Sequence, residues 1–259
     1  MYSYGFGYRN RKVGGAANPN SFLTNPVYWH NAELSVVTQP TAAGISDITD
    51  LTGNDVRMTQ AVEVGRPALI VGGINGHDAI DFEGVTEMME SNAAASTFVD
   101  FHNGTVSWTV GIVLRMLDNV DTQRISGTKA GNNAIGYFVN YNGGTGDFTF
   151  NVGNGASSVF VNLTAASLAI NTNALLLFGY NSSLDRYEMA LNDGTIATAT
   201  PLNAESASDP AHTLTIGRMN ATNTLNLDGY IAEQYGGTGI SPTDAQADAW
   251  AWTQSYFGL

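Results

Sequence analysis

Carboxylate pairs are the first residues to test for chemistry, because glycoside hydrolysis needs two of them beside the scissile bond, roughly 5–10 Å apart. The nearest pairs are Glu87 with Glu90 and Asp185 with Glu188. Each pair is three residues apart, and successive side chains of a strand point to opposite faces, so the two members do not share a face. We interpret all four as solvated surface acids and predict that the protein is not an enzyme.

Metal and nucleophile motifs are the next candidates. Cysteine is absent, which excludes disulfides and thiolate metal sites. The glycine-rich stretches match no Walker or Rossmann fingerprint, and no serine nucleophile elbow is present, so we interpret the glycines as turn residues. The histidines are scattered without HxH or HxxxH spacing, and a zinc site is not expected. They are His30, His77, His102 and His212.

Carbohydrate binding needs an aromatic platform beside amide and carboxylate hydrogen-bonding groups. Residues of these types gather around one predicted hairpin, and we take them as candidate glycan contacts: Asn132, Asn133, Tyr141, Asn142 and Asp147. Asparagine is abundant throughout the chain, and the alternative is that Tyr141 is an ordinary strand residue.

The first residues combine aromatic and basic side chains. Four aromatic rings alternate with Ser and Gly, at Tyr2, Tyr4, Phe6 and Tyr8. Three basic residues follow them, at Arg9, Arg11 and Lys12. Four rings displayed without a partner would be an unusual exposed apolar surface. We therefore predict that residues 1–25 form an extended arm that docks onto an acidic partner or a sister subunit; the alternative is a frayed terminus.

Alternating apolar and polar residues predict many short strands. Over residues 106–117, every second residue from Trp108 to Met116 is apolar, which predicts a half-buried strand with a wetter opposite face. Further strands are predicted at 134–141, 147–152, 158–163, 173–181, 185–191, 212–218 and 225–236, separated by turn signals. Short strands with regular turns indicate an all-β sandwich or barrel.

One helix is predicted, at the C-terminus. Ser241 is a good N-cap, Pro242 suits the first helical position, and Gly258 suits the end. An apolar stripe would pack on the sheet through Ala245, Ala249, Trp252 and Tyr256.

The charge balance excludes one class of partner. The 259 residues hold 10 Lys+Arg against 23 Asp+Glu, a formal net charge of −13, which disfavours binding to nucleic acid. Hydrophobic residues make up 43% of the chain, enough for a core, but no apolar run approaches the roughly 20 residues of a membrane-spanning helix. The composition predicts an acidic, β-rich protein with no membrane partner.

A series of short motifs resembles the concanavalin A-like jelly roll of the laminin-G-like type. The order of the motifs along residues 26–259 is the same as in that family, although each motif alone is weak. The matching segments are Pro26-Val27-Tyr28-Trp29, Asp50-Leu51-Thr52-Gly53-Asn54, Gln60-Ala61, Arg66-Pro67, Asn75-Gly76, 79–84, 107–110, 191–194, 214–217, 228–233 and 256–259.

The resemblance implies an antiparallel two-sheet jelly-roll sandwich over residues 26–259, with the arm before it and the short helix at its end. Proteins of this pattern include virion structural proteins of bacteriophages. We therefore expect a non-enzymatic capsid decoration protein on the virion surface, made in the bacterial cytoplasm. Its expected partners are a major capsid or tail protein and further copies of itself, as in a trimer. The alternative is a carbohydrate-binding tail or fibre adhesin that contacts host glycans; a glycan-cleaving enzyme is a distant third.

The family's calcium-binding members suggest a further ligand. Laminin-G-like domains hold calcium through loop aspartates and backbone carbonyls. The residues of this type are Asp118, Asp121, Asp193 and Asp228. No twelve-residue calcium loop is present, and the prediction is that no cofactor is bound.

Overall fold

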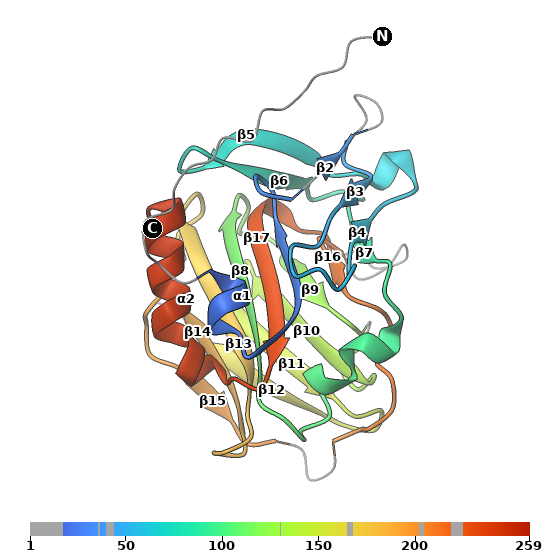
Figure 1. The fold of residues 1–259 in the computed structure, drawn as a ribbon, viewed down its shortest axis with the longest axis vertical. Helices are drawn as coiled ribbons and strands as arrows, with labels where there is room; N and C mark the ends of the chain where they lie inside the picture. The colour runs from blue at the N-terminus through green and yellow to red at the C-terminus, as the bar shows by residue number, and fades with distance from the viewer. Residues whose placement is uncertain are drawn as a thin grey trace.

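A computed structural model describes residues 18–35, 37–39, 44–129, 131–164, 168–201, 205–218 and 225–259. The described residues form two antiparallel sheets with a helix at each end of the described chain (Figure 1). This confirms the predicted all-β sandwich with a C-terminal helix. No helix in the described part of the chain is long and apolar enough to cross a membrane.

The first sheet, sheet A, has the strand order β15-β14-β13-β8-β17-β6-β5, and β1 also pairs with β17. Its strands are β1 (Asn25–Asn31), β5 (Ala68–Ile74), β6 (His77–Glu83), β8 (Trp108–Met116), β13 (Asn173–Asn181), β14 (Arg186–Leu191), β15 (Ala197–Ala199) and β17 (Asp228–Thr238).

The second sheet, sheet B, has the order β12-β11-β10-β9-β16-β7-β4-β3-β2. Its strands are β2 (Val37–Thr38), β3 (Asp47–Ile48), β4 (Met58–Thr59), β7 (Met89–Ser91), β9 (Thr122–Gly127), β10 (Gly136–Asn142), β11 (Asp147–Gly153), β12 (Ser158–Leu163) and β16 (Thr215–Ile216). Two short 3-10 helices, η1 (Glu63–Gly65) and η2 (Ala95–Phe101), connect strands.

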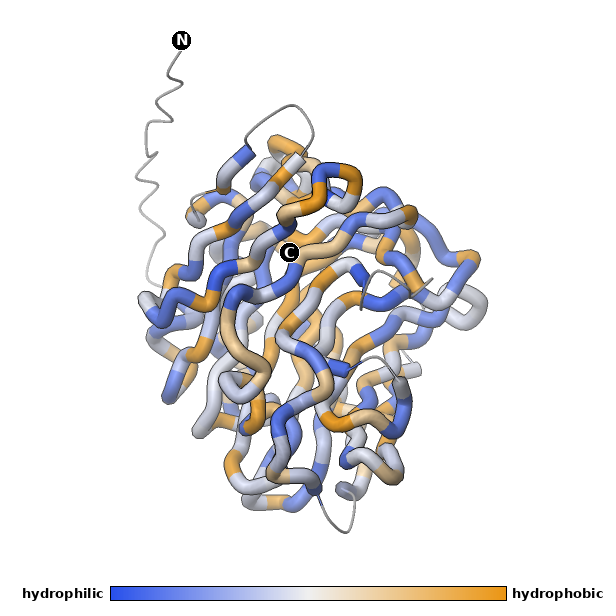
Figure 2. Tube along the Cα trace, turned by 90° about the vertical axis from the view of Figure 1, so that its right-hand side faces the viewer, coloured by the Kyte–Doolittle hydropathy of each residue, from blue (hydrophilic) through white to orange (hydrophobic). Residues whose placement is uncertain are grey.

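The main core lies between the two sheets. Strand β8 contributes the residues that the alternation predicted, from Trp108 to Met116, and Figure 2 shows hydrophobic residues alternating with hydrophilic ones along much of the trace. The prediction of a wetter opposite face was wrong, because Thr109 and Val113 on that face are also buried. Helix α2 (Pro242–Phe257) covers this outer face of sheet A and forms a second core with it.

Helix α2 begins and ends as its sequence predicts. Ser241 accepts a hydrogen bond from the backbone N–H of Asp244, Pro242 occupies the first turn, and Gly258 ends the helix with a φ of 67°. Only glycine adopts that left-handed conformation without steric cost. The predicted apolar stripe from Ala245 to Tyr256 is buried.

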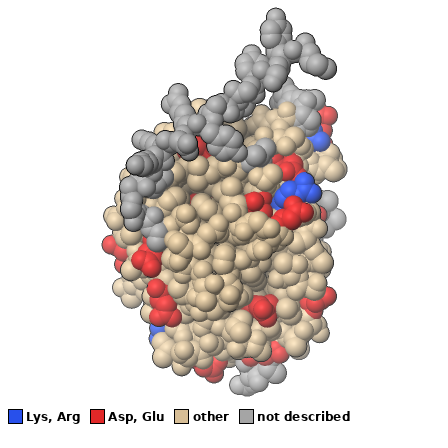
Figure 3. Space-filling model, in the orientation of Figure 1, with Lys and Arg blue, Asp and Glu red and all other residues tan. Residues whose placement is uncertain are grey.

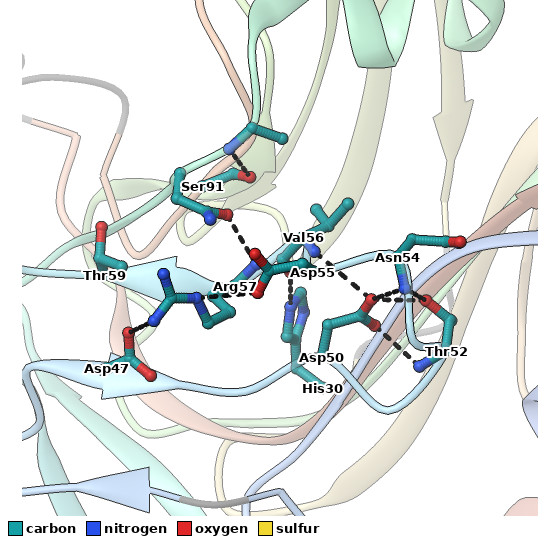
Figure 4. Close-up of polar contacts among 12 residues, drawn as sticks. His30, Asp47, Asp50, Thr52, Asn54, Asp55, Val56, Arg57, Thr59 and Ser91 are labelled. Atoms are coloured by element: carbon teal, nitrogen blue, oxygen red, sulfur yellow. Dashed lines mark hydrogen bonds and ion pairs between the residues drawn. The ribbon is translucent and has the colours of Figure 1, made fainter.

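Two of the sequence motifs bind one another in the structure. The carboxylate of Asp50 accepts hydrogen bonds from the backbone N–H groups of Thr52 and Asn54, at 3.0 and 3.1 Å (Figure 4). It also accepts one from the backbone N–H of Trp29 at 2.9 Å. The amide of Asn54 donates to the carbonyls of Pro26 and Val27, at 2.9 and 3.1 Å. The turn after residue 50 therefore fastens the opening strand, which explains why the two motifs occur together.

The first described residues lie beside helix α2. Helix α1 (Pro19–Phe22) contacts α2 and β1, and Phe22 packs edge-to-face on Tyr235 with ring centroids 5.5 Å apart. Residues 19–22 are therefore helical and packed where the sequence predicted an extended arm. The domain boundary placed at residue 25 stays a prediction.

Candidate carbohydrate-binding face

The structure places the predicted glycan contacts at the two ends of one hairpin. Asn142 and Asp147 face one another where β10 turns into β11. Asn132 and Asn133 lie before β10 and are exposed, and the carbonyl of Asn133 accepts the N–H of Gly155 just beyond the far end of β11. Since β10 is seven residues long, roughly 20 Å separate the two groups. The five predicted residues do not form one cluster.

The expectation for Tyr141 needs correction. Its side chain points into the main core, where it is 1% exposed and packs on Phe148 with ring centroids 5.2 Å apart. Strand alternation is the physical reason, because Tyr137, Val139 and Tyr141 all face the core. The ring therefore offers no surface on which a sugar could stack, and the alternative interpretation as a strand residue is correct.

The outer face of the same strands carries the polar side chains. Residues of β9, β10, β11 and β12 that alternate with core residues point away from sheet A, and two cross-strand rows result. One row consists of Arg124, Asn140, Thr149 and Asn162, and the next of Phe138, Asn151 and Phe160. We call these seven residues the amide face.

The amide face is open at β12 and closed toward β9. Phe160 is 41% exposed and Asn162 is exposed, whereas Asn140 and Thr149 are each 8% exposed. Thr149 donates its hydroxyl to the side-chain oxygen of Asn162 at 3.1 Å. An exposed ring beside an amide is the combination that carbohydrate recognition uses.

Several polar atoms on this face have no partner. The side-chain oxygens of Asn140 and Asn151 and the Nε of Arg124 are buried and form no hydrogen bond in the described part of the chain. Buried polar atoms are nearly always paired, and exceptions need an explanation such as a water or a ligand. Two acceptors and one donor on neighbouring strands are thus unpartnered, and all three are covered, with Asn151 itself 0% exposed.

Two cations lie at the closed end. The guanidinium of Arg124 lies 3.6 Å from the ring centroid of Phe138, and the ammonium of Lys129 lies 5.1 Å from it. Their polar contacts are to backbone carbonyls: Arg124 donates to the carbonyl of Lys129 at 3.2 Å, and Lys129 to that of Asn132 at 2.7 Å. Burial lowers the pKa of Arg124 to about 9. Burial, followed by the charge of Arg124, lowers the pKa of Lys129 to about 7.

Glycine makes room for the second cation. A Cβ atom at Gly153 would lie 2.4 Å from the carbonyl oxygen of Ala134 and 2.6 Å from the Nζ of Lys129. Gly153 ends β11, so the strand itself leaves the space that the ammonium fills.

The remaining predicted residues lie elsewhere. The candidate arm residues Tyr2, Tyr4, Phe6, Tyr8, Arg9, Arg11 and Lys12 lie outside the described residues. Among the aspartates named as candidate calcium ligands, Asp193 lies in the β14–β15 turn and Asp118 and Asp121 lie between β8 and β9. No group of three His, Asp or Glu that could hold a metal is found in the described ranges.

The predicted surface acid Glu188 is wholly buried, which corrects its interpretation as a solvated residue. Its carboxylate accepts hydrogen bonds from Arg186 at 2.8 Å, Asn181 at 3.0 Å and the backbone N–H of Thr243 at 2.9 Å. It therefore joins β14 to the first turn of α2. Glu90 is exposed on β7, as predicted.

Most of the amide face was missed from the sequence. A signal was present, because Asn140, Thr149 and Asn151 alternate with the aromatic and branched residues that predicted the strands. Arg124 and Lys129 gave no such signal, since strand β9 was not predicted and a lysine is seldom buried.

No protein-family model and no curated protein sequence matches the chain, but solved structures share its fold. The binding domain of botulinum neurotoxin serotype D is 10% identical, with a TM-score of 0.60 over 88% of this chain and 51% of that one. A second neurotoxin binding domain, from serotype DC in complex with SialylT, is 12% identical, with a TM-score of 0.59 over 90% and 52%. The chain thus spans about half the length of these structures.

A smaller relative in fold is the CBM40 of the Ruminococcus gnavus IT-sialidase. It is 15% identical, with a TM-score of 0.53 over 65% of this chain and 95% of that one. Identities this low establish a shared fold and no more. These neighbours are binding domains by name, and none of these findings links the chain to a bacteriophage.

Proposed function

We propose that this protein is a non-catalytic carbohydrate-binding protein that uses the amide face. The observation that carries the proposal is the exposed Phe160 ring two residues from the exposed amide of Asn162 on the same face of β12, next to the buried, unpartnered oxygen of Asn151 on β11. A saccharide presents hydroxyl groups that donate to such oxygens and a C–H face that stacks on such a ring. The binding-domain neighbours support this reading by fold analogy.

Glycan binding, the alternative function expected from the sequence, thus becomes the main one. The capsid decoration role, the virion location and the trimer remain predictions that the fold does not address. Several copies on one support would strengthen weak binding to a repeated glycan through multivalency.

A glycan array with matched variants tests the proposal. Phe160→Ala and Asn162→Ala are expected to weaken binding about tenfold each, the effect of losing one contact worth about 1.4 kcal/mol. Leu184→Ala and Asn20→Ala are the controls, because both residues are exposed away from the amide face, and they should bind like the parent protein.

Two results would overturn the proposal. One is the absence of binding to any glycan by a protein whose circular dichroism shows a folded β domain. The other is binding that the control variants weaken as much as the amide-face variants do.

A further inference from the structure

Arg124 and Lys129 are buried without a counterion. Their side chains belong to residues that are 3% and 0% exposed. Every Asp and Glu of the chain lies in the described part, and the ion pairs found there involve Arg57, Arg186 and His77. The carbonyl partners of Arg124 and Lys129 carry partial charges only, so no counterion neutralises Arg124, while the pKa of Lys129, lowered to about 7, leaves that ammonium fully charged only below neutral pH.

Such an arrangement is costly for the fold. Two like charges out of water repel one another, and each loses its hydration. The stacking of both cations on Phe138 offsets only a small part of this cost. A feature that weakens folding without a local benefit points to a functional role.

We propose that Arg124 and Lys129 bind an anionic substituent of the saccharide, a carboxylate or a sulfate. This inference rests on the proposed function and names its ligand class. An anion needs hydrogen-bond donors, and the other unpartnered atoms of the amide face are the acceptor oxygens of Asn140 and Asn151. The unpartnered Nε of Arg124 supplies a donor. The neighbouring Asn140, which pairs with Arg124 across β9 and β10, offers its unpartnered oxygen to an adjacent sugar hydroxyl.

The proposed route of entry is past Asn132, an exposed residue beside the buried Lys129 at this end of the hairpin. The ammonium of Lys129 is held by the carbonyl of Asn132, and the side chains of Asn132 and Asn133 are exposed at this end of the hairpin. The anion must exchange with that carbonyl, so the described residues 131–133 shift when it binds. These two asparagines then flank the ligand.

The anion site is a local exception to the negative charge of the protein as a whole. The chain carries a formal net charge of −13, and Figure 3 shows Asp and Glu scattered over a largely uncharged face. The general field therefore repels anions. Selectivity for an anionic sugar needs a local positive site, and the two cations beside Phe138 provide one.

The test measures binding by calorimetry to four probes at matched ionic strength: lactose, lactose carrying a sialic acid, lactose carrying a sulfate ester, and inorganic sulfate. The protein should prefer one or both charged sugars over lactose. Lys129→Met, which keeps the length of the side chain and removes its charge, should weaken that preference roughly thirtyfold or more. Its affinity for lactose, which carries no anionic group, should fall far less than its affinity for the charged sugars.

The same variant separates a binding role from a structural one. Because Lys129→Met removes an uncompensated buried charge, its melting temperature should equal or exceed that of the parent protein. A clear fall in melting temperature would assign Lys129 to folding and overturn the inference. Arg124→Lys, which keeps the charge but loses the planar guanidinium, should reduce the preference for the charged sugar at similar stability.

The outcomes distinguish this inference from the proposed function. Binding of lactose and charged sugars with equal affinity, unaffected by Lys129→Met, overturns the inference and leaves the proposed function intact. Binding of inorganic sulfate alone overturns it as well, since the site would then recognise a free anion. Failure to bind any saccharide, in calorimetry or on the array, overturns both.

Discussion

Trp29 and Trp252, which lie near opposite ends of the chain, donate their indole N–H groups to the two oxygens of one buried carboxylate. The distances to Glu233 are 2.7 Å from Trp29 and 2.9 Å from Trp252, and the two rings meet edge-to-face with centroids 6.1 Å apart. Asn31 adds a third donor at 3.1 Å. The first strand and the last helix are therefore joined through a single acid on β17.

Glu233 should make stability fall with rising pH. Burial raises the pKa of this carboxyl from 4.5 to about 7, against the three donors, which favour the charged form. Between these values the folded state holds a proton that the unfolded state has lost, so the free energy of unfolding decreases as pH rises through about 7. The full effect of this shift is about 3 kcal/mol.

Urea unfolding of Glu233→Gln at pH 5, 6, 7 and 8 measures this effect. The amide resembles the protonated acid, so the variant should match the parent protein near pH 5 and gain relative stability toward pH 8. If the free energy of unfolding of the parent protein instead rises relative to that of the variant as pH rises, the three donors outweigh burial and the pKa of Glu233 is lowered in the folded state.

Glu188 should be a large contributor to stability. Glu188→Ala leaves Arg186 without its partner and the first turn of α2 without an acceptor at Thr243. Removing one member of a buried ion pair costs about 3–5 kcal/mol; since Arg186 is partly exposed, the lower end is expected. Thermal unfolding of this variant beside Glu90→Ala, an exposed acid on β7, measures the difference, and equal melting temperatures would contradict it.

Gly153 should resist enlargement by a single methyl group. In Gly153→Ala the new Cβ would collide with the carbonyl of Ala134 and the ammonium of Lys129, so the end of the hairpin must shift. Overpacking of this kind costs about 1–3 kcal/mol. Gly144→Ala is the control, because nothing lies within 4 Å of a Cβ there. In chemical denaturation the midpoint of Gly153→Ala should lie below that of Gly144→Ala. Equal midpoints would show that the end of β11 shifts to accept the methyl group at no measurable cost.

The fold could be predicted from the sequence to the extent that local patterns determine it. Strand β8 and helix α2 followed from alternation and from the capping residues Ser241 and Gly258. Burial of the second face of β8 could not be predicted, because it depends on α2 packing there from a distant part of the chain. The same holds for Glu188, whose surroundings come from β13 and α2.

The candidate site was predicted only in part, for a related reason. Asn132, Asn133, Asn142 and Asp147 were chosen from one hairpin by residue type, but β9 and β12 supply the neighbouring columns of the face. Strand β9 was missed because its sequence shows no apolar alternation: Arg124 is on the outer face and a register shift follows it. Which residues share a face is a property of strand pairing, which spacing alone does not determine.

The position of α1 has a consequence for how the molecule is oriented when it is tethered. Phe22 and Leu23 are buried in the second core, on the side of sheet A that α2 covers, whereas the amide face looks outward from sheet B on the opposite side of the sandwich. A support attached to the chain before residue 18 would therefore hold the protein on the side of sheet A that α2 covers. The amide face would then point away from that support.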